Sequence, residues 1–217
     1  MKWGLFGGTF DPVHVGHLRC AEEVLELFAL DKVFFIPAHR QPLKTDREVL
    51  SFHHREQMIR RAVAGNPSFA VSDMEEKRGG RSYSVATVRS FLKTAPAGTE
   101  LYFILGQDAF SEIPRWKEWD ELLRLCNFVV MTRPGHAKKT PRDIFPSPVA
   151  SQFSYDGSAD GFTGPSGRFI FFRTLTLLDI SSTDIRNRVE GHQSIRYLVP
   201  EPVREYILGH SEKGYFS

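Results

Sequence analysis

The chain has 217 residues, with 41% hydrophobic and 25% charged residues, two cysteines and a formal net charge of +2 at pH 7. This length can bury one sizeable core but is short for two, so we expect a single domain over 1–217. The small charge argues against nucleic-acid or membrane partners, and neither a signal peptide nor an apolar run of ~18 residues is apparent. We therefore expect a cytoplasmic protein, with Cys20 and Cys126 as buried, reduced thiols.

Apolar runs and amphipathic segments alternate over the first part of the chain, and they predict strands and helices respectively. The expected strands are 2–6, 32–37, 69–73, 101–105 and 127–132. The expected helices are 16–30, 49–64, 84–93 and 120–125. Alternating strands and helices are typical of βαβ units. We predict an α/β fold with a doubly wound, Rossmann-like parallel sheet and helices on both faces, which binds ligands beyond the carboxyl ends of its strands.

The later part of the chain is less regular. Residues 135–168 are rich in Gly, Pro, Ser and Asp and lack periodicity, which predicts a long, flexible surface loop inserted into the domain. Such a loop can also serve as a lid. Strands are expected over 168–172 and 175–180, and helices over 181–189 and 202–209.

A glycine-rich turn joins the first strand to the first helix. Its backbone N–H groups, together with the helix start, offer a place for phosphate, although neither the P-loop nor the G-x-G-x-x-G pattern is present. His14 and His17 follow, three positions apart and therefore on one helical face, with Gly16 between them. Three interpretations remain open for this pair: structural histidines, a zinc site without obvious further ligands, and phosphate contacts, which the turn favours.

A second polar cluster lies far along the chain, at the start of a predicted helix. Ser181 and Asp184 have the spacing of a capping box, so a simple N-cap is one interpretation. Arg186 lies in the first turn, where the helix dipole disfavours a cation, and this indicates an anion nearby. This cluster and the glycine-rich turn thus each offer a place for an anionic group.

Both clusters resemble motifs of a known family. The run "GGTFDPVHVGH" is similar to the H-x-G-H signature of the nucleotidyltransferase superfamily and, in its full length, to the bacterial nicotinate mononucleotide adenylyltransferases. The run "DISSTDIRNRV" resembles the I-S-S-T-x-I-R motif of the same superfamily. The resemblance implies an enzyme that transfers the adenylyl group of ATP to nicotinate mononucleotide, releasing pyrophosphate and forming nicotinate adenine dinucleotide for NAD biosynthesis.

Further segments resemble those that hold the pyridine nucleotide in this family. They are "GGRSYSVATV", where Ser84 replaces the usual Thr, "ILGQDAFSEIPRWKEWDEL", and "IPAHRQPLKT". The family tryptophan stacks on the pyridine ring, which here implies Trp116, although a core aromatic is the alternative. The substrate-binding residues implied by the resemblance are Lys44, Tyr83, Ser84, Gly106, Asp108 and Trp116.

The resemblance also implies the remaining roles. His14, His17 and Arg186 would be catalytic. The residues expected to contact ATP are Gly7, Gly8, Thr9, Phe10, His17, Arg133, Ile180, Ser181, Ser182, Thr183 and Arg186. Mg²⁺ is expected to bridge the ATP phosphates without dedicated protein ligands.

Alternatives remain for the acceptor and for catalysis itself. Nicotinamide mononucleotide or phosphopantetheine are other possible acceptors within the superfamily, and a non-catalytic nucleotide sensor would keep the fold. The attacking phosphate is already an anion, so no general base is needed, and catalysis reduces to positioning and charge stabilisation. The oligomeric state is not predicted.

Overall fold

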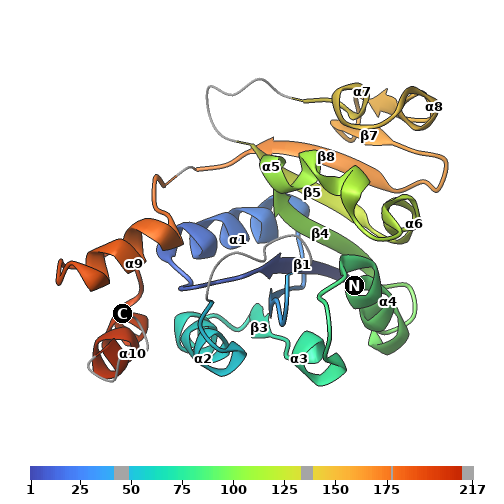
Figure 1. Ribbon diagram of the computed structural model, residues 1–217. Coiled ribbons are helices and arrows are strands. Elements are labelled where there is room, and N and C mark those ends of the chain that lie inside the picture. The colour runs from blue at the N-terminus through green and yellow to red at the C-terminus, as the bar shows by residue number, and fades with distance from the viewer. Residues whose placement is uncertain (42–48, 133–138, 177, 212–217) are drawn as a thin grey trace.

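The computed structural model describes residues 1–41, 49–132, 139–176 and 178–211. Within these residues, one eight-stranded sheet has the order β3-β2-β1-β4-β5-β8-β7-β6 and carries helices on both faces (Figure 1). The strands are β1 (Lys2–Gly8), β2 (Lys32–Pro37), β3 (Phe69–Val71), β4 (Glu100–Gly106), β5 (Asn127–Thr132), β6 (Ser154–Asp156), β7 (Gly161–Thr163) and β8 (Phe169–Thr174). All pairs from β3 to β8 are parallel, whereas β7 and β6 add an antiparallel hairpin.

The helices fall into two groups: long helices, which cover the sheet, and short helices, which lie in the connections between the other elements. Long helices are α1 (Val15–Phe28), α2 (Phe52–Val63), α4 (Ser84–Thr94), α9 (Ser182–Glu190) and α10 (Glu201–Ser211). Shorter ones are α3 (Met74–Arg78), α5 (Gln107–Ser111), the 3₁₀ turn η1 (Ile113–Arg115), α6 (Trp119–Leu125), α7 (Pro141–Ile144) and α8 (Ser147–Ala150). Every strand and helix predicted before residue 133 is present, with small shifts at the ends.

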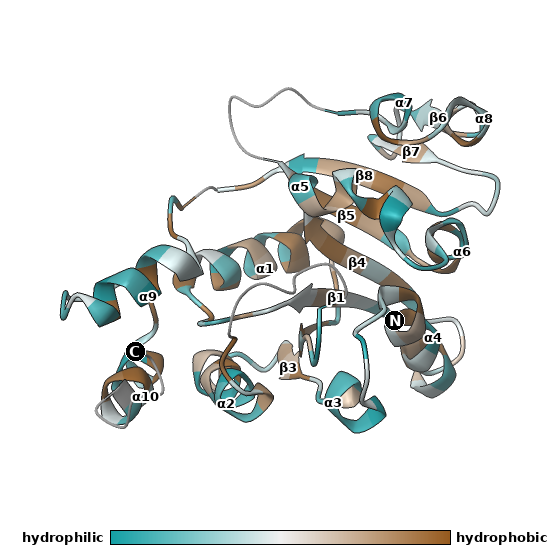
Figure 2. Ribbon diagram, in the orientation of Figure 1, coloured by the Kyte–Doolittle hydropathy of each residue, from teal (hydrophilic) through white to brown (hydrophobic). Residues whose placement is uncertain are grey.

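Two apolar cores lie on opposite faces of the sheet. Neighbouring strand residues point alternately into them, so that Phe6 belongs to the core beneath α1, α2 and α10, while Leu5 belongs to the core beneath α4 and α6. Figure 2 shows hydrophobic residues concentrated on the central strands and hydrophilic ones on outer helices such as α9. The predicted doubly wound α/β fold is therefore confirmed.

The strand order reverses at β1. Its neighbours are β2 on one side, reached through α1, and β4 on the other. In sheets of this kind, ligands bind outside the carboxyl ends of the strands at the point of reversal. Gly8 ends β1 and Gly106 ends β4, so both lie at this point. The C-terminal helices reach the same region, where Val15 at the start of α1 donates a backbone hydrogen bond to Leu198 at 3.0 Å.

Two predictions about the later chain are wrong. Residues 139–168 are not an irregular loop, because they form α7, α8 and the β6–β7 hairpin, which extends the sheet beyond β8. The predicted strand over 175–180 is absent from its described residues. The residues after β8 instead cross towards α1, where Thr176 N–H donates to Glu23 Oε2 at 2.8 Å, and this backbone group is thereby satisfied by a side chain and not by a strand. Among the described residues, no helix is long and apolar enough to span a membrane.

Candidate active site

The loop after β1 is shaped by glycine and an aromatic ring. Phe10 is 2% exposed and has a φ of 51°, an unusual backbone conformation for a residue with a side chain. Its ring lies over Gly8, where a Cβ atom would approach Phe10 Cζ to 2.9 Å. A side chain at Gly8 would therefore displace this ring and with it the loop, which explains the glycine at this position.

The two histidines stack on each other at the start of α1. His14 is the N-cap residue and His17 lies in the first turn, and their ring centroids are 3.7 Å apart with an interplanar angle of 29°. The backbone N–H of His14 donates to Nδ1 of His17 at 3.2 Å. A Cβ at Gly16 would come within 3.1 Å of His14 Nδ1, so Gly16 leaves room for this ring. The shared face predicted for the histidines is confirmed.

Both imidazoles are held in their neutral form. Burial lowers the pKa of His14 to about 4. Burial, and secondarily the adjacent His14, also lower the pKa of His17 well below its usual range. Because Nδ1 of His17 accepts a hydrogen bond, its proton is assigned to Nε2, which makes that atom a donor. His14 Nδ1 is buried without a hydrogen-bond partner in the described part of the chain.

The second motif packs directly against the first. Ser181 caps α9 by accepting the N–H of Asp184 at 3.0 Å, as the capping spacing predicted. The Ser182 hydroxyl donates to the carbonyl of Pro12 at 2.9 Å. Arg186 Nη1 donates to the carbonyl of Asp11 at 2.6 Å, and its Nη2 donates to Thr183 Oγ1 at 2.9 Å. The two segments are therefore in contact, as expected, although they are far apart in sequence.

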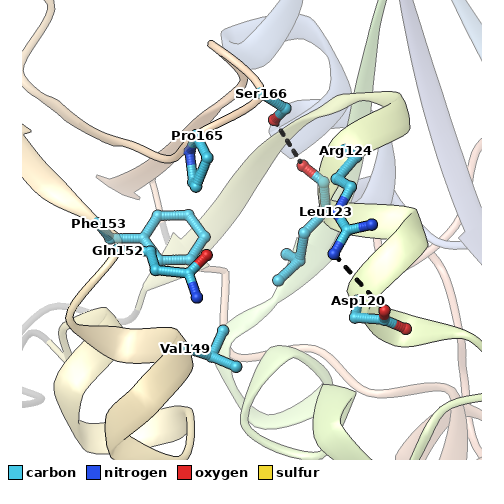
Figure 3. A pocket seen from close by; sticks show the side chains of 8 residues that line it. All are labelled: Asp120, Leu123, Arg124, Val149, Gln152, Phe153, Pro165 and Ser166. Atoms are coloured by element: carbon cyan, nitrogen blue, oxygen red, sulfur yellow. Dashed lines mark hydrogen bonds and ion pairs between the residues drawn. The ribbon is translucent and has the colours of Figure 1, made fainter.

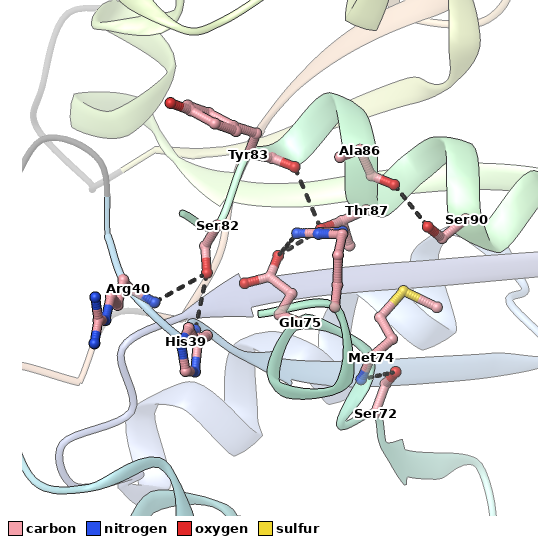
Figure 4. Close-up of polar contacts among 11 residues, drawn as sticks. His39, Arg40, Ser72, Met74, Glu75, Ser82, Tyr83, Ala86, Thr87 and Ser90 are labelled. Atoms are coloured by element: carbon pink, nitrogen blue, oxygen red, sulfur yellow. Dashed lines mark hydrogen bonds and ion pairs between the residues drawn. The ribbon is translucent and has the colours of Figure 1, made fainter. Parts of the chain in front are cut away.

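The start of α4 is fixed by a polar network (Figure 4). The Ser82 hydroxyl accepts the backbone N–H of His39 at 2.8 Å and of Arg40 at 3.3 Å. The Ser82 N–H donates back to the carbonyl of Arg40 at 2.8 Å. Close by, the Thr87 hydroxyl donates to the buried carboxylate of Glu75. The chain that follows β2 is therefore tied to the residue immediately before Tyr83.

The remaining substrate-binding candidates gather around the ends of β4 and the start of α4. Tyr83 is the N-cap of α4 and Ser84 is its first residue. Gly106 caps α5, and Asp108 is exposed in its first turn. Trp116 is partly buried, with its ring centroid 6.3 Å from that of Phe103.

Contacts of Lys117 and Arg89 connect α4 to the segment that carries Trp116 and to α6. Lys117 Nζ lies 4.7 Å from the centroid of the Tyr83 ring. Arg89 on α4 binds Glu121 of α6 at 3.0 Å and Glu118, which precedes α6, at 2.5 Å. The segment that carries Trp116 is thus linked to the start and the middle of α4.

Other sequence predictions have mixed outcomes. Lys44 and Arg133 lie outside the described residues. Ile180 is partly buried, and its N–H donates to Leu178 at 2.8 Å. Cys126 is buried but Cys20 only partly, and burial raises the pKa of both thiols, which keeps them protonated at neutral pH. No group of three or more potential metal ligands occurs among the residues that the structure describes.

The sequence analysis missed one residue at the centre of this site. Arg55 on α2 is 2% exposed and donates to the carbonyl oxygens of Leu50 at 2.8 Å, Thr9 at 2.8 Å and Ala38 at 2.7 Å. A signal was present, because Arg55 precedes Met58 and Ile59 by three and four positions. A cation on the apolar face of an amphipathic helix indicates a buried polar function.

A separate groove lies away from these residues, between α6, α8 and the turn before β8 (Figure 3). Its volume is about 310 Å³, and its walls include Leu123, Val149, Phe153 and Pro165, with Asp120 and Arg124 at one side. None of its lining residues belongs to the two motifs or to the polar network at α4.

Comparison with known proteins gives consistent results. A family model described as cytidylyltransferase-like matches residues 5–188. A protein of Geobacter sp. (strain M21), described as "Probable nicotinate-nucleotide adenylyltransferase", is 46% identical over 207 residues, 95% of each chain. A protein of Syntrophotalea carbinolica with the same description is 43% identical over 210 residues, covering 97% of this chain and 96% of the relative.

The fold is also found in a solved structure. The nicotinic acid mononucleotide adenylyltransferase of Plasmodium falciparum, in complex with NaAD, superposes with a TM-score of 0.71 over 99% of this chain and 98% of that one. The sequence identity is 15%, so this likeness concerns the fold alone.

Proposed function

This chain belongs to the cytidylyltransferase-like family and, within it, to the nicotinate-nucleotide adenylyltransferases of NAD biosynthesis, and we propose that the site between the end of β1 and the start of α9 carries out its adenylyl transfer. The phosphate oxygen of nicotinate mononucleotide attacks the α-phosphorus of ATP. The bond from the α-phosphorus to the bridging oxygen breaks, and pyrophosphate leaves with the electron pair. The products are nicotinate adenine dinucleotide and pyrophosphate.

One observation carries this proposal: the two motifs form a single structure. Ser182 donates to the carbonyl of Pro12 at 2.9 Å, and Arg186 to that of Asp11 at 2.6 Å. These contacts support a shared site in which the glycine turn, the imidazole pair and the guanidinium act on one ligand. These are the groups that stabilise negative charge on phosphate oxygens.

We assign the histidines the role of neutral hydrogen-bond donors. The lowered pKa values keep both rings uncharged at pH 7 in the free protein, and His17 presents Nε2–H. A neutral donor stabilises charge that develops on the phosphate oxygens, and it needs no proton transfer because the nucleophile is already ionised. Arg186 supplies the positive charge. The backbone N–H groups of residues 8–10 and the hydroxyls of residues 181–183 complete the proposed ATP contacts.

We assign the pyridine nucleotide to the region between the start of α4 and the end of β4. Tyr83, Ser84, Gly106 and Asp108 border it, and Trp116 offers a ring face for the pyridine. The ion-pair links of Arg89 to Glu118 and Glu121 support this assignment, because they tie the Trp116 segment to α4. The roles of Lys44 and Arg133 remain predictions from the resemblance.

Mg²⁺ fits this site as a metal held by ATP. The described ranges contain no group of three or more potential protein ligands. Mg²⁺ commonly takes its ligands from phosphates and water. When bound, the ion would neutralise charge on the triphosphate and on the leaving pyrophosphate.

The test is an assay of the purified protein with ATP and Mg²⁺, with pyrophosphate release and dinucleotide formation measured together. Nicotinate mononucleotide, nicotinamide mononucleotide and phosphopantetheine are compared as acceptors at equal concentration. We expect the highest kcat/KM with nicotinate mononucleotide. Absence of pyrophosphate with all three acceptors would refute the proposed activity, and preference for either of the others would refute the proposed substrate.

A further inference from the structure

Arg55 is a buried cation whose hydrogen bonds all go to neutral groups. Its three donor nitrogens reach carbonyl oxygens of three segments: Leu50, two residues before α2, Thr9 in the loop after β1, and Ala38 in the chain after β2. Burial lowers the pKa of the guanidinium, and the neighbouring carboxylates of Asp11, Glu76 and Glu75 oppose that shift. Burying a cation in this way is costly, and three well-directed hydrogen bonds offset only part of that cost.

The segments that Arg55 joins belong to the proposed site and are also bonded to each other. Ala38 N–H donates to the carbonyl of Gly8 at 2.9 Å, and Gln41 Nε2 donates to Thr9 Oγ1 at 2.5 Å. The chain after β2 thus lies beside the glycine turn and is held to it at two points. Arg55 binds both the glycine turn and the chain after β2, through the carbonyl oxygens of Thr9 and Ala38.

This arrangement bears directly on the backbone donors. The Thr9 carbonyl precedes the peptide N–H of Phe10, so the hydrogen bond from Arg55 fixes the orientation of that peptide plane. The carbonyl points towards Arg55, and the N–H on the opposite side of the plane points away from it. Phe10 in turn packs against His17, with ring centroids 5.1 Å apart.

We propose that Arg55 is a positioning residue for the triphosphate, which orients the backbone donors of the glycine turn and adds a buried positive charge behind them. The inference rests on the proposed adenylyl transfer at this site. The residue acts through the loop and does not touch the reacting atoms.

The pyridine side has an anchor of its own. The chain after β2 is held to α4 by Ser82, whose hydroxyl accepts from His39 and Arg40, and Arg55 makes none of these contacts. Loss of the guanidinium fork should therefore weaken ATP binding and turnover while leaving the affinity for the acceptor largely unchanged.

The experiment compares Arg55→Lys with Met58→Ala. Lysine keeps the charge but cannot reach three carbonyls as the planar fork does. Met58 is fully buried one turn further along α2, so its truncation destabilises the same helix without removing a hydrogen bond to the loop. For Arg55→Lys we expect KM for ATP to rise at least about fivefold and kcat to fall about tenfold, with KM for the acceptor within about twofold. For Met58→Ala we expect a lower Tm and unchanged KM values.

A readout without turnover separates this inference from the proposed function. The ring resonances of His17 and the hydrogen exchange of the amides of residues 8–10 are measured by NMR in the same variants. We expect both to change in Arg55→Lys and neither in Met58→Ala. If the wild-type protein releases no pyrophosphate, the proposed function fails, while these measurements still test the positioning role.

Three results would overturn the inference. The first is an Arg55→Lys protein whose kinetic constants match those of Met58→Ala at similar Tm. The second is an equal rise in KM for ATP and for the acceptor. The third is failure of both Arg55→Lys and Arg55→Gln to fold while Met58→Ala folds, because Arg55 would then have a purely structural role.

Discussion

Arg186 Nη1 lies 2.6 Å from the carbonyl oxygen of Asp11, a residue 175 positions earlier in the chain. The same guanidinium binds Thr183 Oγ1 at 2.9 Å, so it is fixed at two points. The sequence placed Arg186 in the first turn, but α9 begins at Ser182, so Arg186 is its fifth residue and lies just past that turn. The backbone carbonyl and the neighbouring hydroxyl hold the guanidinium in place. The positive charge of Arg186 is therefore already held in place in the protein without a ligand.

Replacement of Arg186 by lysine should reduce kcat/KM for ATP by at least about tenfold, because an ammonium cannot hold both contacts and still direct a planar donor pair at phosphate. Steady-state kinetics with ATP as the varied substrate measure this effect. Arg188→Lys is the matched control, since Arg188 lies on the same helix and pairs with Asp184 at 2.9 Å. Equal kinetics for the two variants would contradict the role of Arg186.

The tautomer of His17 predicts different outcomes for two amide replacements. Gln can place its NH₂ group near the position of Nε2, whereas Asn mimics Nδ1, which only accepts the N–H of His14. We expect His17→Asn to lower kcat by at least about tenfold and His17→Gln to retain more activity. Single-turnover rates separate this effect from product release. If the two variants are reversed in order, Nδ1 is the important atom.

Removal of the Trp116 ring should raise KM for the pyridine nucleotide about fivefold, which corresponds to the ~1 kcal/mol of an aromatic stacking contact. Trp116→Phe should retain most of the affinity. Trp119→Ala serves as the control, because the ring of Trp119 stacks on Phe145 with centroids 5.5 Å apart and should affect stability alone. Unchanged KM in Trp116→Ala, together with a lowered Tm, would make Trp116 a core residue.

The buried imidazole of His14 should make stability depend on pH. Its pKa is about 4 in the folded protein and near 6.5 when exposed, so the unfolded chain binds the proton first as pH falls. His14 should therefore lower the free energy of unfolding between about pH 6.5 and pH 4, by about 3 kcal/mol at most, and His17 should add to the decrease in the same direction. Urea unfolding at several pH values measures this slope. A His14→Gln variant should show a shallower slope over this range, and an unchanged one would contradict the assignment.

The fold was largely predictable because the strands are apolar on both sides. Runs such as 32–37 and 101–105 place alternate residues in two cores, and only a sheet covered on both faces buries them all. The contact between the two motifs was also expected from the resemblance. The N-cap role of Ser181 followed from local spacing alone, since capping requires no distant partner.

The remaining features depend on contacts that local patterns do not encode. The short elements in 139–163 span three or four residues each, too few to show periodicity. The run at 175–180 has a strand-like composition, but strands form only where an edge is free to pair. Arg55 was missed because two of its three acceptors, Thr9 and Ala38, come from other segments of the chain, although its place on an apolar helix face was visible.

The β6–β7 hairpin has a bearing on solubility. Without it, β8 would expose the row of unpaired backbone groups of Phe169–Thr174, an apolar segment prone to join a second molecule. β7 pairs with Phe169 and Ile170, and the outermost strand becomes the three-residue β6. In the half of β8 that does not pair with β7, Arg173 donates to the carbonyl of Asp160 at 2.8 Å. Its charged side chain there disfavours pairing with a strand of another molecule. The insertion thus leaves only a short strand open to intermolecular pairing at this edge of the sheet.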